Sequence, residues 1–494
     1  MSTARGFAAW TIAAALFTGG RFAMAQTGTP PGAPKAAASS ASADKRAALE
    51  KAWRDGAHRR VEDELTAAFK SDPAWARDTC MALTTGSDTS ARPLGAVLLA
   101  RHARAAELAA MASSLDTVRF PDERRRLVRA VGVRGAAEED RKPVLATLRP
   151  FLRDRDLLVR AAAASAMADL GRPEAVADLA GLVDRIPAYV NSENVDEREI
   201  FQRAACGAVR SLTGLRPRSV DAIKRWLADT ANGTRVPPRP APRPAAPPTD
   251  VWNGQEFTQA PSFDVYMRVA GMKSAPGDGP LSWSSLSKNS ETGAAAARAA
   301  LERVAGGPVH EPIPRLYLCD AREFSARAGV TFFQGVTKSN EIVIKLDPPA
   351  ALAGTMAHEY VHWIHQNLYN DQPRWVSEGL ATSFATSVKS SVWKERVPEG
   401  DLKKMIERGI FSELFNWNSA GSSDAREASR YALSHIAVDY LRFGAFSVSE
   451  ERIAFFMGRI ARKESPTRAL AATYGKDAKA MDRGALEWLA KTGQ

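Results

Sequence analysis

Three of the seven histidines of this chain fall within eight residues, in the segment TMAHEYVHWIHQNL at 355–368. His358 and His362 are four residues apart, so on an α-helix they share one face and can direct ring nitrogens at one point. Glu359 lies one step around the helix, beside that point. This His-Glu-x-x-His spacing is typical of two imidazoles that hold Zn²⁺ and a glutamate that handles the proton of a metal-bound water.

A third ligand is needed, because the five-residue pattern arises by chance at roughly the per cent level in a chain of this length. Catalytic zinc sites use three protein ligands and keep a fourth position open. The segment PRWVSEGLATSFA at 373–385 supplies Glu378, far enough after His362 for one helix to end and a second to return. We therefore predict a Zn²⁺ site formed by His358, His362 and Glu378. Gly379 is expected to let the two helices approach closely.

The elements that must position these residues follow from the pattern of the second half of the chain. RLYLC at 315–319 predicts a strand, and Asp320 with Glu323 predicts a capping box for the short helix AREFSARA. VTFFQGV and EIVIKL then predict two strands joined through TKSN as a hairpin. The long helix with the histidines begins just after the second strand. From residue 400 onward the pattern is again mostly helical.

HEYVH followed by WVSEGLA resembles the gluzincins, and specifically the peptidase-MA-like family of bacterial zinc metallopeptidases. The resemblance covers about residues 255–490 and implies an α+β zincin-like domain that hydrolyses a protein or peptide substrate, with Glu359 as general base. It implies that the strand just ahead of the zinc helix, here EIVIKL, forms the edge of the cleft. In SRYALSHIAVDYL, Tyr431 takes the position of a family tyrosine and is thereby a candidate donor to the oxyanion.

The sequence differs from the motifs of several zinc-peptidase families, and these differences narrow the families that it can resemble. The Met-Glu-Asn motif of zinc aminopeptidases is missing, which favours an endopeptidase. The metzincin pattern needs glycine where His365 stands and histidine at Leu368. Thermolysin-like enzymes have an aspartate at the place of Thr382, where it braces a histidine, so the identity of the bracing group here is open. We interpret His365 as a polar or supporting residue, because a fourth ligand would close the site.

The region from residue 45 to 230 is predicted to be almost entirely helical, with internal similarity. DLLVRAAAASAMADLG at 156–171 resembles EIFQRAACGAVRSLTG at 199–214, with Arg160 and Arg203 in the same place. Asp156, Val159 and Arg160 match the Asp-x-x-Val-Arg element of HEAT-type repeats. The resemblance implies stacked helix pairs that offer a surface for a protein partner. The alternative is a plain helical bundle.

The predicted organisation is multidomain. Arg5, an apolar run at 7–20 and the sequence AMA ending at Ala25 are typical of a cleaved bacterial-type export signal, so we expect a periplasmic or secreted protein. No later stretch is apolar enough to predict a membrane span. The expected parts are a signal peptide (1–25), a disordered spacer (26–44), an all-α HEAT-like domain (45–230), a proline-rich linker (231–250) and a gluzincin-like metallopeptidase domain (251–494).

Charge and cysteine content exclude two other classes. The formal net charge is +11, but the basic residues are spread along the chain, which argues against a nucleic-acid-binding stripe. Cys80, Cys206 and Cys319 give neither a disulfide framework nor metal-ligand spacing. Two functions stay open: an exported zinc peptidase, or a non-catalytic envelope scaffold that binds through its helical repeats and keeps a degenerate or structural zincin domain. The intact Glu359 favours the enzyme.

Overall fold

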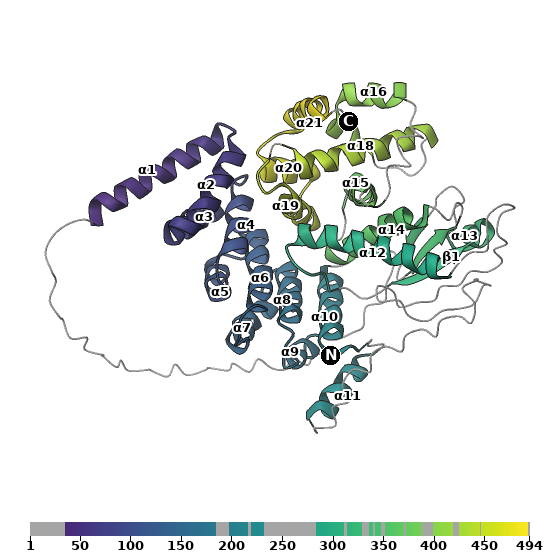
Figure 1. The fold of residues 1–494 in the computed structure, drawn as a ribbon, viewed down its shortest axis with the longest axis horizontal. Coiled ribbons are helices and arrows are strands. Elements are labelled where there is room, and N and C mark those ends of the chain that lie inside the picture. Colours follow the sequence, from purple (N-terminus) through teal and green to yellow (C-terminus); the bar gives the residue numbers. More distant parts are fainter. Residues whose placement is uncertain are drawn as a thin grey trace, which may run out of the picture. The chain divides into compact units, whose positions relative to one another are not determined.

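The computed structural model of the chain is predominantly helical (Figure 1). Within the described residues, 21 α-helices and one short 3-10 helix accompany three β-strands. The structure describes residues 35–183, 197–215, 219–231, 283–310, 314–328, 335–338, 341–346, 351–369, 372–386, 388, 399–417, 424–444 and 446–492. The predicted signal peptide, and the proline-rich linker apart from its first residue, lie outside these ranges.

The N-terminal half is helical throughout its described part. Its elements are α1 (Lys35–Arg54), α2 (His58–Ser71), α3 (Pro73–Thr85), α4 (Arg92–His102), α5 (Ala105–Ser114), α6 (Pro121–Gly135), α7 (Lys142–Leu148), η1 (Arg149–Arg153), α8 (Leu157–Leu170), α9 (Ala175–Ala180), α10 (Glu197–Thr213) and α11 (Val220–Ala231). Contacts place the described residues from Leu49 onward in one compact unit. Helix α1 begins ten residues before the predicted boundary at 45, because the Ala-rich segment after Pro34 favours helix over a disordered spacer.

The C-terminal half adds a small sheet to further helices. Its elements are α12 (Trp283–Ala305), β1 (Arg315–Cys319), α13 (Ala321–Ala328), β2 (Gly335–Lys338), β3 (Glu341–Lys345), α14 (Leu352–Leu368), α15 (Arg374–Ala385), α16 (Glu399–Arg408), α17 (Ile410–Phe415), α18 (Asp424–Phe443), α19 (Ser449–Ala461), α20 (Pro466–Tyr474) and α21 (Ala478–Thr492). The strand predicted at 315–319 and the helix after it are confirmed. β2 and β3 pair antiparallel as predicted, but Thr337 and Lys338, which were predicted in the turn, belong to β2.

Helices α4, α6, α8 and α10 stack in chain order (Figure 1). α4 packs against α6, α6 against α8, and α8 against α10. Small residues make this possible: a side chain at Gly132 of α6 would collide with Ala166 of α8. Asp156 caps α8 by accepting a hydrogen bond from the backbone N–H of Val159 at 2.9 Å. This arrangement agrees with the prediction of a helical repeat region.

The three strands form a sheet in the order β1-β3-β2. β1 is parallel to β3, and β2 is antiparallel to it. The expectation that EIVIKL forms the edge of a cleft is therefore wrong, because among the described strands β3 lies in the middle and β2 at one edge. The next strand after α13 is β2, which β3 separates from β1, and strand pattern alone does not fix that order.

Each face of the sheet is covered by a helix. Leu316, Ile342 and Ile344 belong to the large core that includes α14, whereas Tyr317 and Val343 pack with α13 on the other face. The alternation of side chains along a strand sends neighbouring residues to opposite faces, so short strands can serve two cores. The sheet thus supports α14 along part of its length.

The repeat helices are joined directly to the C-terminal half. Arg462, just after α19, donates to Asp122 of α6 at 2.8 Å and to Asp156 before α8 at 2.6 Å. Arg101 of α4 reaches Glu451 of α19 at 2.6 Å. In the described part of the chain, the packing therefore does not divide at the proline-rich segment.

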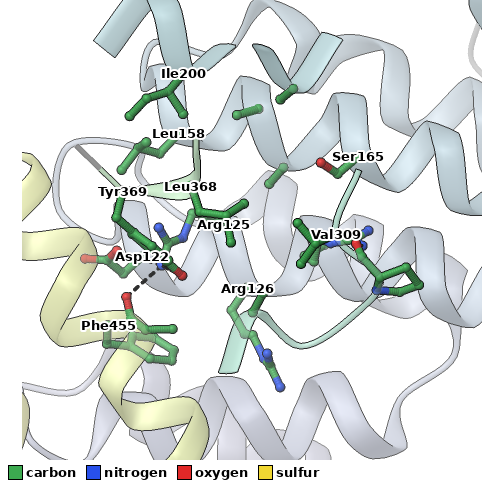
Figure 2. Close-up of a pocket in the computed structure, with 17 residues that line it drawn as sticks. Asp122, Arg125, Arg126, Leu158, Ser165, Ile200, Val309, Leu368, Tyr369 and Phe455 are labelled. Atoms are coloured by element: carbon green, nitrogen blue, oxygen red, sulfur yellow. Dashed lines mark hydrogen bonds and ion pairs between the residues drawn. The ribbon is translucent and has the colours of Figure 1, made fainter. Parts of the chain in front are cut away.

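A cavity of about 70 Å³ lies where repeat helices α6, α8 and α10 meet the ends of α12 and α14 and helix α19 (Figure 2). Arg125 lines it, donating to the carbonyl of Ala454 at 2.8 Å and lying over the ring of Tyr369 at 4.9 Å. Tyr369 follows the last residue of α14. The repeat region thus contacts the end of the helix that carries the histidines, but none of the predicted metal ligands lines this cavity.

Among the helices that the structure describes, none combines the length and apolarity needed to cross a bilayer.

Candidate metal centre

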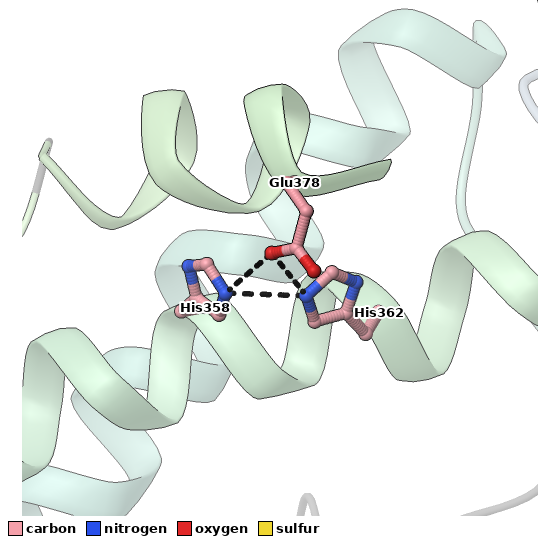
Figure 3. Close-up of side chains that lie close together, drawn as sticks. All are labelled: His358, His362 and Glu378. Carbon is pink, nitrogen blue, oxygen red and sulfur yellow. Dashed lines mark hydrogen bonds and ion pairs between the residues drawn. The ribbon is translucent and has the colours of Figure 1, made fainter. Parts of the chain in front are cut away.

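Helix α14 presents its histidines because its other faces are buried. Met356, Tyr360 and Ile364 recur every four residues and are fully buried in the core. A side chain at Gly293 of α12 would collide with the backbone of α14, so α12 packs closely against that helix. The remaining face carries His358 and His362 toward α15 (Figure 3).

Helix α15 brings the third residue. Val376 and Leu380 are buried and fix the rotation of α15 about its axis. The prediction that Gly379 serves the contact with α14 is wrong. A side chain at Gly379 would lie 2.5 Å from the carbonyl oxygen of Ser434, so the close approach is with α18. Glu378, the residue before it, consequently points from α15 to the two rings of α14 (Figure 3).

The three predicted ligands converge. Nε2 of His358 and Nε2 of His362 are 3.1 Å apart, and each lies 3.3 Å from Oε2 of Glu378. Among the described residues, these three form the one group of histidine, cysteine and acidic side chains that could hold a metal ion. The sequence thus predicted correctly which side chains meet.

The triangle has the dimensions of a tetrahedral zinc site. With Zn–N and Zn–O distances near 2.0–2.2 Å, a tetrahedral arrangement separates its ligand atoms by roughly 3.3–3.5 Å. The observed edges of 3.1 and 3.3 Å come close to this value. Two imidazole nitrogens and a carboxylate oxygen are also a donor set that zinc accepts. The residues present therefore fit a zinc ion.

Charge coupling within the group is strong. Burial alone would raise the pKa of Glu378, but the neighbouring His362 and His358 hold that pKa far below its usual range. Burial would lower the pKa of His362, yet the Glu378 carboxylate and, less strongly, Glu359 raise it above the ordinary value. Glu378 and His362 thus stabilise each other's charged forms.

Ser377 orients the second ligand. Its Oγ lies 2.9 Å from Nδ1 of His362. Metal-binding histidines commonly donate their second ring N–H to such a partner, which fixes the tautomer and the ring plane. With the proton on Nδ1, the lone pair of Nε2 faces the centre of the triangle.

Glu359 is buried against the edge strand rather than on the surface of α14. Its carboxylate accepts a hydrogen bond from the hydroxyl of Thr337 in β2 at 2.8 Å, and the same hydroxyl contacts its backbone carbonyl. A side chain at Gly335 would lie 2.6 Å from Cγ of Glu359, so the glycine leaves room for the carboxylate. Glu359 is thereby held against β2.

Tyr431 lies near the third ligand. It is buried, and burial followed by the charge of Glu378 raises the pKa of its hydroxyl well above the usual range. That hydroxyl accepts a hydrogen bond from Arg374 at 3.3 Å, and its ring packs edge-on against Trp417. The role of Tyr431 toward an oxyanion stays a prediction.

His365 does not join the metal centre. It is buried, and neither ring nitrogen has a hydrogen-bond partner among the described residues. Burial and the nearby His362 lower the pKa of His365 to about 3, so it is neutral. Thr382 is fully buried one turn after Glu378, and its hydroxyl also lacks a partner in the described part of the chain.

Sequence reasoning missed Ser377, Thr337 and Arg374. Ser377 adjoins Glu378, so its position beside the ligand was a usable signal. Arg374 lies one turn before Glu378, so this helical spacing was also a usable signal. Thr337 reaches the site through tertiary packing, which no spacing in the sequence encodes. Comparison with protein-family models and with curated proteins finds no match to this chain, so the interpretation of the site rests on its geometry.

Proposed function

We propose that this chain is an exported zinc-dependent peptidase of the gluzincin type, related to the peptidase-MA-like family, which hydrolyses peptide bonds. The observation that carries the proposal is the triangle of His358, His362 and Glu378, with edges of 3.1 and 3.3 Å. The buried Glu359 beside it supplies a base. Export is proposed from the N-terminal sequence pattern.

In this proposal His358, His362 and Glu378 hold the ion. Zinc bound there would lower the pKa of a water molecule toward about 7 and polarise a carbonyl group. Glu359 takes the proton of the attacking water and returns it to the amine that leaves. Thr337 holds the Glu359 carboxylate by its 2.8 Å hydrogen bond, so the base is oriented before substrate arrives.

The edge strand supports a peptide as substrate. Within the described residues β2 pairs with β3 alone, so its other edge can accept an extended chain. Thr337 of β2 contacts Glu359, and a peptide added to this edge would therefore pass beside the base. The proposal therefore assigns the edge of the cleft to β2, in place of the strand EIVIKL that the resemblance indicated.

The alternative of a non-catalytic scaffold receives less support. Repeat helices α4 and α6 contact α19, and α10 contacts α14, so these surfaces are covered by the chain itself. A scaffold also has no chemical need for a buried carboxylate beside a metal centre. The repeats would then brace the catalytic region, although other faces remain open to a protein partner.

The test is hydrolysis of casein or a peptide library by the full chain loaded with zinc. Glu359→Gln keeps the size of the side chain and the ligands but removes the base, and we expect the rate to fall by about 10²–10⁴-fold. Undiminished hydrolysis by this variant, at equal zinc content, would overturn the mechanism.

A further inference from the structure

Arg374 stands in an unusual position for a cation. It is the first residue of α15, where the partial positive charge of a helix start disfavours a guanidinium. It lies one turn before Glu378 on the same helix. Nearby negative or polar groups must therefore stabilise its charge.

The guanidinium is held by groups from two other segments. Nη2 donates to Glu427 of α18 at 2.6 Å and to the hydroxyl of Tyr431 at 3.3 Å. The guanidinium carbon lies 4.8 Å from the centre of the Trp417 ring. A planar fork clamped by a carboxylate, a hydroxyl and an aromatic face has little freedom to rotate.

The Nε atom of the Arg374 guanidinium faces Glu378. Nε of Arg374 lies 4.0 Å from Oε1 of Glu378, whereas Oε2 of Glu378 faces the two histidine nitrogens at 3.3 Å. The two carboxylate oxygens thus have different neighbours: one faces the guanidinium and the other faces the ligands. Nη1 is buried without a hydrogen-bond partner among the described residues, so the guanidinium is not placed to satisfy all its own donors.

We propose that Arg374 is a positioning residue for the metal centre, which holds the Glu378 carboxylate so that Oε2 alone is presented to the ion. Clamped from three sides, the guanidinium attracts Oε1 and restrains rotation of the carboxylate about its last bond. This inference rests on the proposed function, since it presumes that Glu378 is a ligand. In this inference Arg374 of α15 supports Glu378 directly, and residues of α18 hold Arg374 in place.

The experiment compares zinc affinity and the visible spectrum of the Co²⁺-substituted site in the full chain. Arg374→Gln keeps hydrogen-bonding capacity but removes the charged fork, and we expect zinc affinity to fall about 10–100-fold with a changed cobalt spectrum. Arg374→Lys is also expected to lower zinc affinity, because a single ammonium group cannot reach Glu427, Tyr431 and Glu378 together. Arg430→Gln is the matched control: Arg430 lies 4.0 Å from the same Glu427 and 6.0 Å from the Trp417 ring.

Arg430→Gln should keep wild-type zinc affinity and the wild-type cobalt spectrum. The inference is overturned if Arg374→Gln and Arg374→Lys both keep them, or if Arg430→Gln loses affinity to the same extent. Circular dichroism of each variant identifies one that has failed to fold, and the comparison then uses the other Arg374 variant. Failure of the proposed function looks different, since the wild-type chain itself would then bind no zinc at these ligands.

Discussion

Ser377 lies 2.9 Å from the Nδ1 atom of His362, so the residue that precedes Glu378 holds the ring of a second proposed ligand. One short segment of α15 thereby contributes both a proposed ligand and the support for another. Helix α14 alone does not fix the ring of His362. The register of α15 against α14 decides whether the site forms.

Removing the Ser377 hydroxyl tests this contact. In Ser377→Ala the His362 ring loses the partner of Nδ1, and we expect zinc affinity to fall about 10–100-fold. Ser383→Ala is the control, because Ser383 lies on the same helix and bonds Asp439 of α18. Competition with a chromophoric chelator measures both. Equal affinities for Ser377→Ala and wild type would show that the hydroxyl does not orient the ring.

Arg462 joins the repeat helices to the C-terminal half through Asp122 and Asp156. Arg462→Met leaves both largely buried carboxylates without this cation, and we expect the free energy of unfolding to drop by roughly 3–5 kcal/mol. Arg149→Met removes a more exposed pair with Asp178 and should cost about 1 kcal/mol or less. Urea unfolding followed by tryptophan fluorescence compares the two. Similar small losses would mean that the contact between the halves contributes little.

Glu123 makes stability depend on pH. Burial, and then the neighbouring Asp122, raise the pKa of Glu123 to about 7 from an ordinary value of 4.5, although Arg459 and Arg92 oppose the shift. The folded chain keeps this proton where the unfolded chain has lost it. Stability from this group is therefore present below pH 4.5 and is lost as the pH rises through 7. The loss amounts to roughly 3 kcal/mol.

Glu123→Gln carries no such proton. We expect its free energy of unfolding, relative to wild type, to increase by roughly 3 kcal/mol between about pH 4.5 and pH 7.5. Urea titrations at several pH values measure the difference, and the other titrating groups cancel in the comparison. A difference that stays constant with pH would show that Glu123 is ionised in the folded chain.

The charge of the substrate's C-terminus should have little effect on the rate of hydrolysis. Arg374, the cation that approaches Glu378, is already paired with Glu427 at 2.6 Å, so it offers poor compensation for a terminal carboxylate. We expect kcat/KM for peptides with a free or an amidated C-terminus to agree within about threefold. Mass spectrometry of the products follows both cleavages. A preference of about tenfold or more for the free acid would identify a carboxypeptidase instead.

Local sequence rules predicted well which three side chains converge. His358 and His362 were accessible because helical spacing alone sets their common face, and Glu378 because a returning helix needs a minimum length of chain. The order of the strands in the sheet could not be predicted from the sequence. The residue patterns of strands 315–319, 335–338 and 341–345 do not show which strand lies in the middle. Thr337 and the contacts of Arg462 depend on how distant segments pack, and nothing in their immediate sequence marks them.

The metal content of the full chain shows whether helices α14 and α15 form a zinc centre. The purified protein is loaded with zinc, dialysed and analysed by mass spectrometry for metal per chain, beside Glu378→Ala and Ser383→Ala. We expect one zinc per chain in wild type and Ser383→Ala, and loss of most of it in Glu378→Ala. Wild-type protein without zinc, or Glu378→Ala that retains a full equivalent, would contradict a centre formed by these two helices.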